Sequence, residues 1–179
     1  MRFEGTVLPG VFIIEHDVHE DLRGAFVKTF QKEEFSKMGL EWDFRESYYT
    51  RSKSDVIRGM HFQITPYDHA KLVTIIHGTV VDVILDLRRS SPTIGQHIAV
   101  ELSRENRKSI YIPRGCAHGF LVLGETAVAN YMVTSEHAAS HDKGIRFDSF
   151  GYDWNVARPI ISERDLQFPT LAEFKDYFA

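Results

Sequence analysis

Hydrophobic and polar positions alternate in short runs along most of this chain, and glycine, proline, asparagine or serine separates the runs. Alternation with a period of two is typical of strands that bury one face, and many short strands at spacings of roughly 8–14 residues predict a β-sandwich or barrel. The predicted strands cover residues 11–14, 24–30, 47–50, 56–57, 71–77, 79–87, 95–102, 109–112, 119–123 and 127–133.

Helical patterns are few. Residues 33–38 predict a short helix that Gly39 ends, and residues 171–178 form a helical patch near the C-terminus. No linker, repeat or low-complexity stretch divides the chain, and the part after Gly144 is less regular. We therefore predict a single domain over residues 1–179, with a C-terminal tail that wraps around it.

Residues 80–87 predict how one strand is oriented. Asp82, Ile84 and Asp86 share one face, while the intervening valines and leucines share the other. If the first face points inward, two carboxylates project into the barrel. There they could pair with interior cations such as Lys71, and we expect a supporting role of this kind for Asp82.

Composition narrows the range of partners. The chain has 179 residues, of which 43% are hydrophobic and 26% charged, enough apolar material for one ordinary core. The net charge of −4 gives no electrostatic basis for binding nucleic acid or an anionic membrane. An anionic ligand would have to be held by a few well-placed cations.

The compartment is predicted from cysteine usage and from the N-terminal residues. Cys116 is the one cysteine, so no intrachain disulfide can form. Residues 1–5 lack the pattern of a signal peptide, and no run approaches the ~20 apolar residues of a membrane-spanning helix. These features predict a cytoplasmic protein.

Three segments carry the candidate chemistry, Arg-Gly-Met-His-Phe-Gln at residues 58–63, Pro-Arg-Gly-Cys-Ala-His-Gly-Phe at residues 113–120 and Ser-Glu-Arg-Asp at residues 162–165. The first two resemble the paired motifs of the cupin superfamily, whose metal-binding members hold one ion with three histidines and a carboxylate. Here Gln63 fills a histidine slot and Lys71 fills the acidic slot. An ammonium repels a divalent cation and offers no lone pair, so we expect neither metal nor cofactor.

Several separated motifs between residues 11 and 169 resemble, in the same order, the dTDP-4-dehydrorhamnose 3,5-epimerases. The matching segments are residues 21–24, 57–63, 71–73, 82–83, 86–88, 91–95 and 112–120. The resemblance implies an all-β fold, a double-stranded jelly-roll (cupin-like) barrel with a few short helices, in a homodimer that exchanges N-terminal strands. It also implies metal-free inversion of C3, C5 or both in a nucleotide-diphosphate-linked 4-keto-6-deoxy sugar, as in deoxysugar biosynthesis for surface polysaccharides.

Such a reaction passes through an enolate and needs a base, a cation or donor at the carbonyl oxygen and an acid on the opposite face. By the resemblance, His61 is the base and Asp165 orients its imidazole. Lys71 stabilises the enolate oxygen, with His118 near the same centre. Tyr131 delivers a proton from the far face, which a phenol holds at neutral pH.

Recognition of the nucleotide diphosphate falls, by the same resemblance, to cations and polar groups around the pocket. Arginine forks suit phosphate oxygens, so two arginines are expected at the diphosphate, and a third stands where the family commonly has lysine. The expected substrate-binding residues are Arg23 and Arg58 at the diphosphate, Arg164 in the lysine position, and Gln63, His118, Glu46 and Tyr48.

The chain departs from the family at the nucleotide end. Glu46 replaces a neutral amide, and Glu136 and His137 replace two adjacent tyrosines, a loss that Tyr48 or Tyr49 would compensate. A carboxylate only accepts hydrogen bonds, so the adjacent N–H donors of guanine would suit Glu46 better than thymine would. By the resemblance, the expected partner is a dTDP-linked sugar, and the departure at Glu46 leaves a GDP- or CDP-linked sugar open.

Other interpretations stay open. His61 and His118 could be hydrogen-bonded core histidines, and Tyr131 a packed core tyrosine. A 3,4-ketoisomerase would usually carry a second histidine where Gln63 stands. A non-catalytic sugar-nucleotide-binding barrel would have lost one or more of the catalytic groups, and Gln63 and Lys71 argue against a metal-dependent cupin. Most of the other histidines are expected at the surface: His16, His19, His69, His77, His97, His137 and His141.

Overall fold

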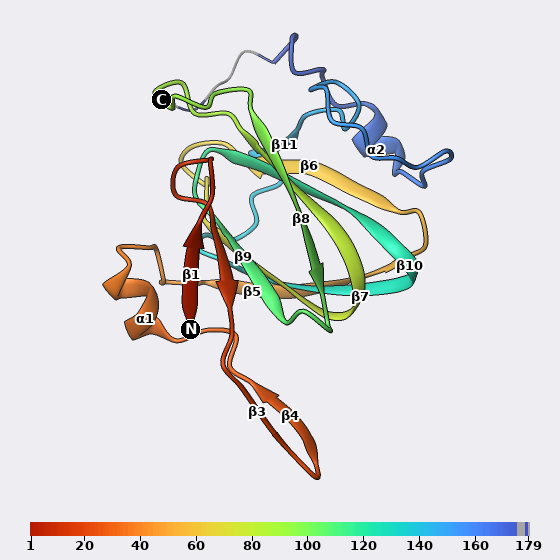
Figure 1. Cartoon of the computed structure of the whole chain (residues 1–179). Coiled ribbons are helices and arrows are strands. Elements are labelled where there is room, and N and C mark those ends of the chain that lie inside the picture. The colour runs from red at the N-terminus through yellow and green to blue at the C-terminus, as the bar shows by residue number, and fades with distance from the viewer. Residues whose placement is uncertain (175–177, 179) are drawn as a thin grey trace.

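The computed structural model describes residues 1–174 and residue 178, and its named strands all pair antiparallel (Figure 1). The strands are β1 Arg2–Gly5, β2 Phe12–Glu15, β3 Val18–Asp21, β4 Gly24–Val27, β5 Glu46–Lys53, β6 Ile57–Gln63, β7 Lys71–Asp86, β8 His97–Ser103, β9 Lys108–Ile112, β10 Cys116–Val133 and β11 Asp142–Gly144. The helices are α1 Lys32–Lys37 and α2 Glu163–Leu166.

The two longest strands, β7 and β10, organise the barrel. The first part of β7 pairs with β9 and the second with β8, while the first part of β10 pairs with β6 and the second with β5. Two sheets therefore share these strands, β1-β2-β9-β7-β10-β5 and β8-β7-β10-β6-β11. This arrangement confirms the predicted jelly roll. The strands predicted at 71–77 and 79–87 are one continuous strand, β7, and those predicted at 119–123 and 127–133 are likewise one strand, β10.

Gly78 explains the break in pattern within β7. Its φ is +74°, and a Cβ there would lie 2.0 Å from the carbonyl oxygen of Thr126 on β10. Only glycine allows such a close approach in this backbone conformation. Gly78, which separates two predicted strands in the sequence, therefore marks a bend within β7 rather than the end of a strand.

The alternation predicted in residues 80–87 is confirmed. Ile84 packs in the interior cluster between the sheets, whereas Val83 and Leu85 pack in a second cluster outside it. Phe150 and Trp154 of the C-terminal segment cover this outer cluster. The tail thus lies against the barrel sheet that carries β6 and the first part of β10.

The helices are short. Helix α1 lies close to the predicted bounds and buries Phe35 against Leu72 and Tyr111. Helix α2 was not predicted. In the predicted helical patch 171–178, residues 171–173 form a turn, and residues 175–177 lie outside the described residues. Within residues 1–174 and 178, no helix has the length and apolar character needed to cross a membrane.

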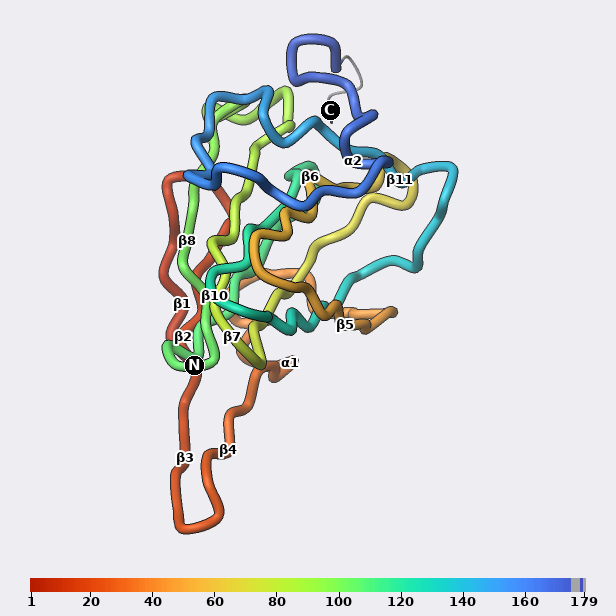
Figure 2. Tube along the Cα trace, turned by 90° about the vertical axis from the view of Figure 1, so that its right-hand side faces the viewer, coloured from red at the N-terminus to blue at the C-terminus, as the bar shows by residue number. Residues whose placement is uncertain are grey.

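A hairpin of β3 and β4 projects away from the barrel (Figures 1 and 2). Its two strands pair only with each other, in a separate two-stranded sheet. Leu22 at its tip is fully exposed, and Phe26 is 61% exposed. The barrel of the same chain therefore leaves the tip uncovered.

Candidate active site

A cavity of about 290 Å³ gathers many of the predicted residues at one end of the barrel. Side chains from β5, β6, β7, β10, β11 and α2 line it, together with two loop histidines. The lining residues are Glu46, Tyr48, His61, Phe62, Gln63, His69, Lys71, Val133, His137, Asp142 and Arg164.

A larger cavity, of about 590 Å³, lies where the hairpin meets β7. Its one histidine, His16, hydrogen-bonds the hydroxyl of Ser109 rather than a carboxylate. Size alone therefore does not identify the site, and we place it in the smaller cavity, which holds a histidine–carboxylate pair.

That pair is His61 and Asp165. The Nε2 of His61 lies 2.8 Å from Oδ1 of Asp165. Because an ionised carboxylate only accepts hydrogen bonds, Nε2 carries the proton and Nδ1 is the ring nitrogen free to take another. The His61 side chain is 30% exposed, whereas that of Asp165 is 5% exposed, so the histidine faces the cavity and the carboxylate stands behind it.

Asp165 is held in place by its own helix and by β6. Ser162 caps α2 by accepting a hydrogen bond from the Asp165 N–H at 3.1 Å. The Asp165 Oδ2 accepts from the backbone N–H of Gly59 at 3.2 Å. Burial opposes ionisation of Asp165, but the hydrogen bonds from His61 and Gly59 outweigh it and hold the pKa of the carboxyl below its usual value. Asp165 is therefore a carboxylate at neutral pH.

Lys71 supplies a buried cation beside the base. It is 6% exposed, and its Nζ donates to the carbonyl oxygen of His61 at 3.1 Å. Burial lowers the pKa of its ammonium to about 8, although the carboxylates of Asp142 and Asp82 oppose that shift. Lys71 is thus still protonated at pH 7, and its ammonium is largely withdrawn from solvent.

Tyr131 lies one layer behind the cavity wall. Its ring stacks on that of Tyr48, which lines the cavity, with 4.8 Å between ring centroids and 16° between planes. Burial, with Tyr48 and Asp82 adding to it, raises the pKa of Tyr131 above its ordinary value. Burial, Glu46 and Asp142 raise the pKa of Tyr48 to about 12. Both phenols therefore keep their protons at neutral pH.

His118 forms a second histidine–aspartate pair. Its Nε2 lies 2.8 Å from Oδ2 of Asp82, and the two side chains are 4% and 0% exposed. His118 does not line the cavity but packs edge-on against Tyr131. Asp82 therefore supports a histidine, and in the described residues it forms no ion pair with Lys71.

The expectation that Asp86 pairs with an interior cation such as Lys71 is wrong. Asp86 accepts hydrogen bonds from Arg88, Ser91 and Thr93 in the turn that follows β7. Its carboxylate therefore organises this turn and stays away from the cavity.

Of the three arginines predicted to bind substrate, one lines the cavity. Arg164 lines it and donates to Oδ2 of Asp142 at 2.7 Å. Arg58, predicted at the diphosphate, is exposed, is absent from the cavity lining and donates to the hydroxyl of Ser52 at 2.8 Å. Arg23 stands at the hairpin tip, where it bonds Asp21, so its own barrel does not bring it to the cavity.

Some lining residues were not predicted. Asp142 on β11 and His69 in the loop before β7 both face the cavity. His69 was expected at the surface, yet it is partly buried, and burial together with the positive charge of Lys71 lowers the pKa of its imidazole to about 3. His137 is exposed as expected and also lines the cavity. No local pattern marks these residues, because partners from other segments define their surroundings.

The donor set of the cavity matches side-chain acid–base chemistry. Across residues 1–174 and 178, no three histidine, cysteine or carboxylate side chains are grouped so that they could hold a metal ion. The cavity instead combines a base with a free ring nitrogen, a buried ammonium and the protonated phenol of Tyr48, behind which Tyr131 lies. That combination can remove, stabilise and return a proton next to a carbonyl.

Known proteins are similar to this chain in sequence and fold. The family model described as dTDP-4-dehydrorhamnose 3,5-epimerase matches residues 5–173. A protein of that description from Methanothermobacter thermautotrophicus is 41% identical over 96% of this chain and 95% of its own length.

Solved structures agree with this match. The enzyme of the same description from Elizabethkingia anophelis is 37% identical, covers 99% of both chains and superposes with a TM-score of 0.93. The dTDP-6-deoxy-D-glucose-3,5-epimerase of Legionella pneumophila, in complex with dTDP-4-keto-L-rhamnose, is 31% identical over 97% of this chain and 94% of that one, with a TM-score of 0.92.

Proposed function

Because this chain belongs to the dTDP-4-dehydrorhamnose 3,5-epimerase family, we propose that it inverts C3 and C5 of a dTDP-linked 4-keto-6-deoxy sugar. It is an isomerase, a nucleotide-sugar epimerase. The observation that carries the finer proposal is the His61–Asp165 pair, which faces the same cavity as the buried ammonium of Lys71.

Proton removal begins each inversion. His61 takes the proton from the carbon next to the ketone on its free Nδ1, and the imidazolium that forms is stabilised by the carboxylate of Asp165. The electron pair of the broken C–H bond moves to the C4 oxygen. Lys71 donates a hydrogen bond to that oxygen, and its low-dielectric surroundings strengthen the interaction.

Reprotonation from the opposite face completes the inversion. We assign this step to Tyr131, whose proton passes to the same carbon while the ketone re-forms. A phenol is protonated at neutral pH, so Tyr131 holds a proton to give when the enolate appears. His61 then returns its proton to solvent and Tyr131 regains one.

The nucleotide end supports a thymidine substrate. One carboxylate oxygen of Glu46 accepts the backbone N–H of His137 at 2.8 Å, which leaves the other oxygen for a base. Guanine offers two adjacent N–H donors, whereas thymine offers one, so a single free oxygen matches thymine. Tyr48, stacked on Tyr131, provides a ring face beside Glu46.

We further propose a homodimer in which the β3–β4 hairpin of one protomer reaches the cavity of the other. The hairpin projects from its own barrel (Figure 2). The Arg23 side chain, in the turn between β3 and β4, is 91% exposed. A guanidinium in that position would supply a diphosphate contact that the cavity of a single chain lacks.

The deciding experiment is deuterium uptake in heavy water, followed by NMR and mass spectrometry, with dTDP-, GDP- and CDP-linked 4-keto-6-deoxy sugars. Deuterium at both C3 and C5 of the dTDP sugar is the expected result, and His61→Asn serves as the matched inactive control. Uptake at one carbon would make the enzyme a single-site epimerase. Preference for the GDP sugar would reverse the assignment at Glu46, and no uptake from any of them would overturn the proposal.

A further inference from the structure

Gln63 was expected to contact substrate, but its amide is fully engaged inside the protein. It is 4% exposed, its Oε1 accepts from the backbone N–H of Ala138 at 2.6 Å, and its Nε2 donates to the carbonyl oxygen of Tyr67 at 2.8 Å. A second donation at 3.1 Å is available to the carbonyl oxygen of Glu136. An amide has one acceptor oxygen and two N–H groups, so this network leaves it little capacity for a ligand.

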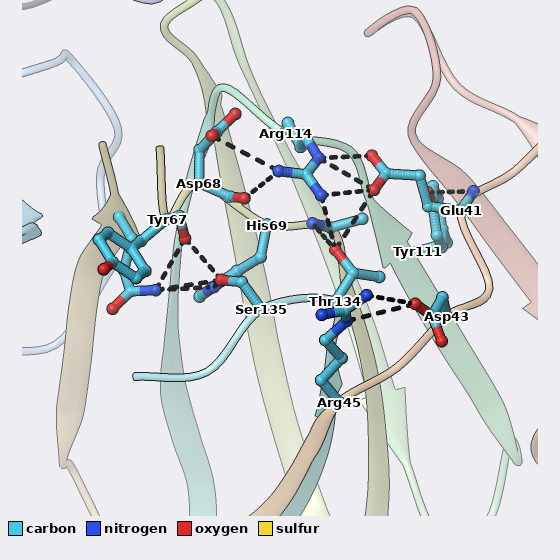
Figure 3. Close-up of polar contacts among 12 residues, drawn as sticks. Glu41, Asp43, Arg45, Tyr67, Asp68, His69, Tyr111, Arg114, Thr134 and Ser135 are labelled. Atoms are coloured by element: carbon cyan, nitrogen blue, oxygen red, sulfur yellow. Dashed lines mark hydrogen bonds and ion pairs between the residues drawn. The ribbon is translucent and has the colours of Figure 1, made fainter. Parts of the chain in front are cut away.

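The same junction includes His69 and Ser135. The Nδ1 of His69 lies 3.1 Å from Nε2 of Gln63 and 3.1 Å from Oγ of Ser135. Ser135 donates in turn to the carbonyl oxygen of Tyr67 at 2.6 Å (Figure 3). The two N–H groups of Gln63 go to the carbonyl oxygens of Tyr67 and Glu136, and the Ser135 hydroxyl goes to Tyr67. The N–H at Nδ1 of His69 therefore donates to Oγ of Ser135, and the imidazole is neutral. Its low pKa, about 3, agrees with that state.

Three segments meet at this junction, and each adjoins a residue of the proposed mechanism. Gln63 follows His61 by two residues on β6. His69 precedes Lys71 by two residues at the start of β7. Residues 135–138 follow the end of β10, the strand that carries Tyr131. One buried amide therefore links the ends of the strands that bear the base, the cation and the acid.

We propose that Gln63 is a positioning residue, which fixes the spacing of His61, Lys71 and Tyr131 and does not bind substrate. The proposal rests on the proposed function for the identity of those three groups. Gln63 also holds the segment whose His137 N–H bonds Glu46, so it couples the catalytic strands to the nucleotide end. A misplacement of about 1 Å at a reacting group can slow catalysis 100-fold, so such a link has a measurable effect.

The fold does not depend on this amide alone. Arg114 lies on the other side of the same loops, where it bonds both oxygens of Glu41 and the carbonyl oxygen of Asp68 (Figure 3). Thr134 accepts the backbone N–H of Ala70 at 3.0 Å. These contacts hold the two loops together when Gln63 is changed, so Gln63 variants are expected to fold.

The test compares Gln63→Met, which keeps the side-chain length without polar atoms, with Gln63→Glu, which keeps the acceptor and loses the donors. We expect kcat to fall by about 10- to 100-fold in Gln63→Met, while the Kd for dTDP and the KM change only a few-fold. Gln63→Glu should recover part of its kcat as the pH falls, since a protonated carboxyl regains one donor. Ser103→Ala is the control, because it removes a buried hydrogen bond in the β8–β9 turn, which contributes nothing to the cavity.

A fall in dTDP or substrate affinity that matches the loss of activity would make Gln63 a ligand and overturn the proposal. The proposal would also be overturned if Gln63→Met lost activity only in proportion to its loss of thermal stability, as Ser103→Ala is expected to do. Hydrogen exchange of the backbone amides of residues 134–138 tests the role of Gln63 independently of the proposed function. It should accelerate in Gln63→Met even if the wild type acts on no 4-keto sugar, and unchanged exchange would show that the junction does not hold that segment.

Discussion

His61 and His118 are direct register partners across the antiparallel pair β6–β10, and each hydrogen-bonds its own aspartate. Their environments nevertheless differ, because the His61 side chain is 30% exposed to the cavity and that of His118 is 4% exposed. Close approach of the two strands makes this pairing possible, since a Cβ on Gly59 would lie 2.4 Å from Cα of Gly119. One histidine thus faces the cavity, and the other is buried against Tyr131.

Asp165→Asn should reduce deuterium exchange at C3 and C5 by on the order of 10²–10⁴-fold. The amide keeps the shape of the carboxyl but cannot stabilise an imidazolium at His61, and it can favour the wrong tautomer. Exchange is measured by NMR in heavy water, with Asp148→Asn as an exposed control outside the cavity. A loss smaller than about tenfold would remove Asp165 from the mechanism.

Tyr131→Phe should separate exchange from inversion. The phenyl ring preserves the stack on Tyr48 but removes the proposed donor, so inversion slows while His61 still removes hydrogen and returns deuterium to the same face. The measurement is the ratio of exchanged to inverted sugar, and Tyr152→Phe, which removes a phenol of the C-terminal segment outside the cavity, is the control. Inversion at the wild-type rate in Tyr131→Phe would transfer the acid role to another group.

The activity should decline as the pH rises through about 8, the pKa of Lys71. The ammonium that stabilises the enolate is present below this pH and is lost above it, so kcat/KM falls by roughly tenfold per pH unit on the basic side. Lys71→Met should remove most activity together with this dependence, whereas Lys143→Met, an exposed change on β11, should retain both. A flat profile between pH 7 and about 10 would contradict the role of Lys71.

Local patterns predicted the elements and faces of the barrel but not its long-range contacts. The alternation in residues 80–87 placed Ile84 inward and Val83 outward, because a strand side chain responds to its immediate neighbours. Residues 162–165 stand out in the sequence, but no local pattern indicates that a four-residue helix delivers Asp165 to His61, a contact across 104 positions. That pairing came from the family resemblance.

The same limit explains the missed and corrected residues. His69 and Asp142 acquire their roles from segments that meet only in the folded barrel, so neither has a sequence signature. Asp86 was expected to pair with a cation such as Lys71, but its carboxylate accepts hydrogen bonds from Arg88, two residues later in the chain. Gln63 occupied the right position for a site residue, yet its hydrogen bonds are all internal.

Asp86→Asn should destabilise the fold at neutral pH but not in strong acid. Burial opposes ionisation, yet hydrogen bonds from Arg88, Ser91 and Thr93 lower the pKa of Asp86 to about 2. Because this folded-state pKa is depressed, the stabilisation is present above the unfolded pKa near 4 and is lost as the pH falls toward 2. Urea unfolding should show a deficit of about 2 kcal/mol at pH 7 that shrinks by pH 3, whereas exposed Asp153→Asn changes little. A deficit independent of pH would mean that the charge is not responsible.

Exchange of the hairpin between protomers predicts complementation between two inactive variants. Arg23→Ala removes the proposed diphosphate contact and His61→Asn removes the base, so each homodimer should be nearly inactive. If Arg23 serves the partner's cavity, a mixed dimer contains one cavity that lacks both groups and one that has both, and activity returns after co-refolding. If Arg23 serves its own barrel, each cavity of the mixed dimer lacks one group and no activity returns. Measuring exchange before and after mixing therefore decides which barrel the hairpin completes, and Arg146→Ala, an exposed arginine of the tail, controls for the loss of a surface charge.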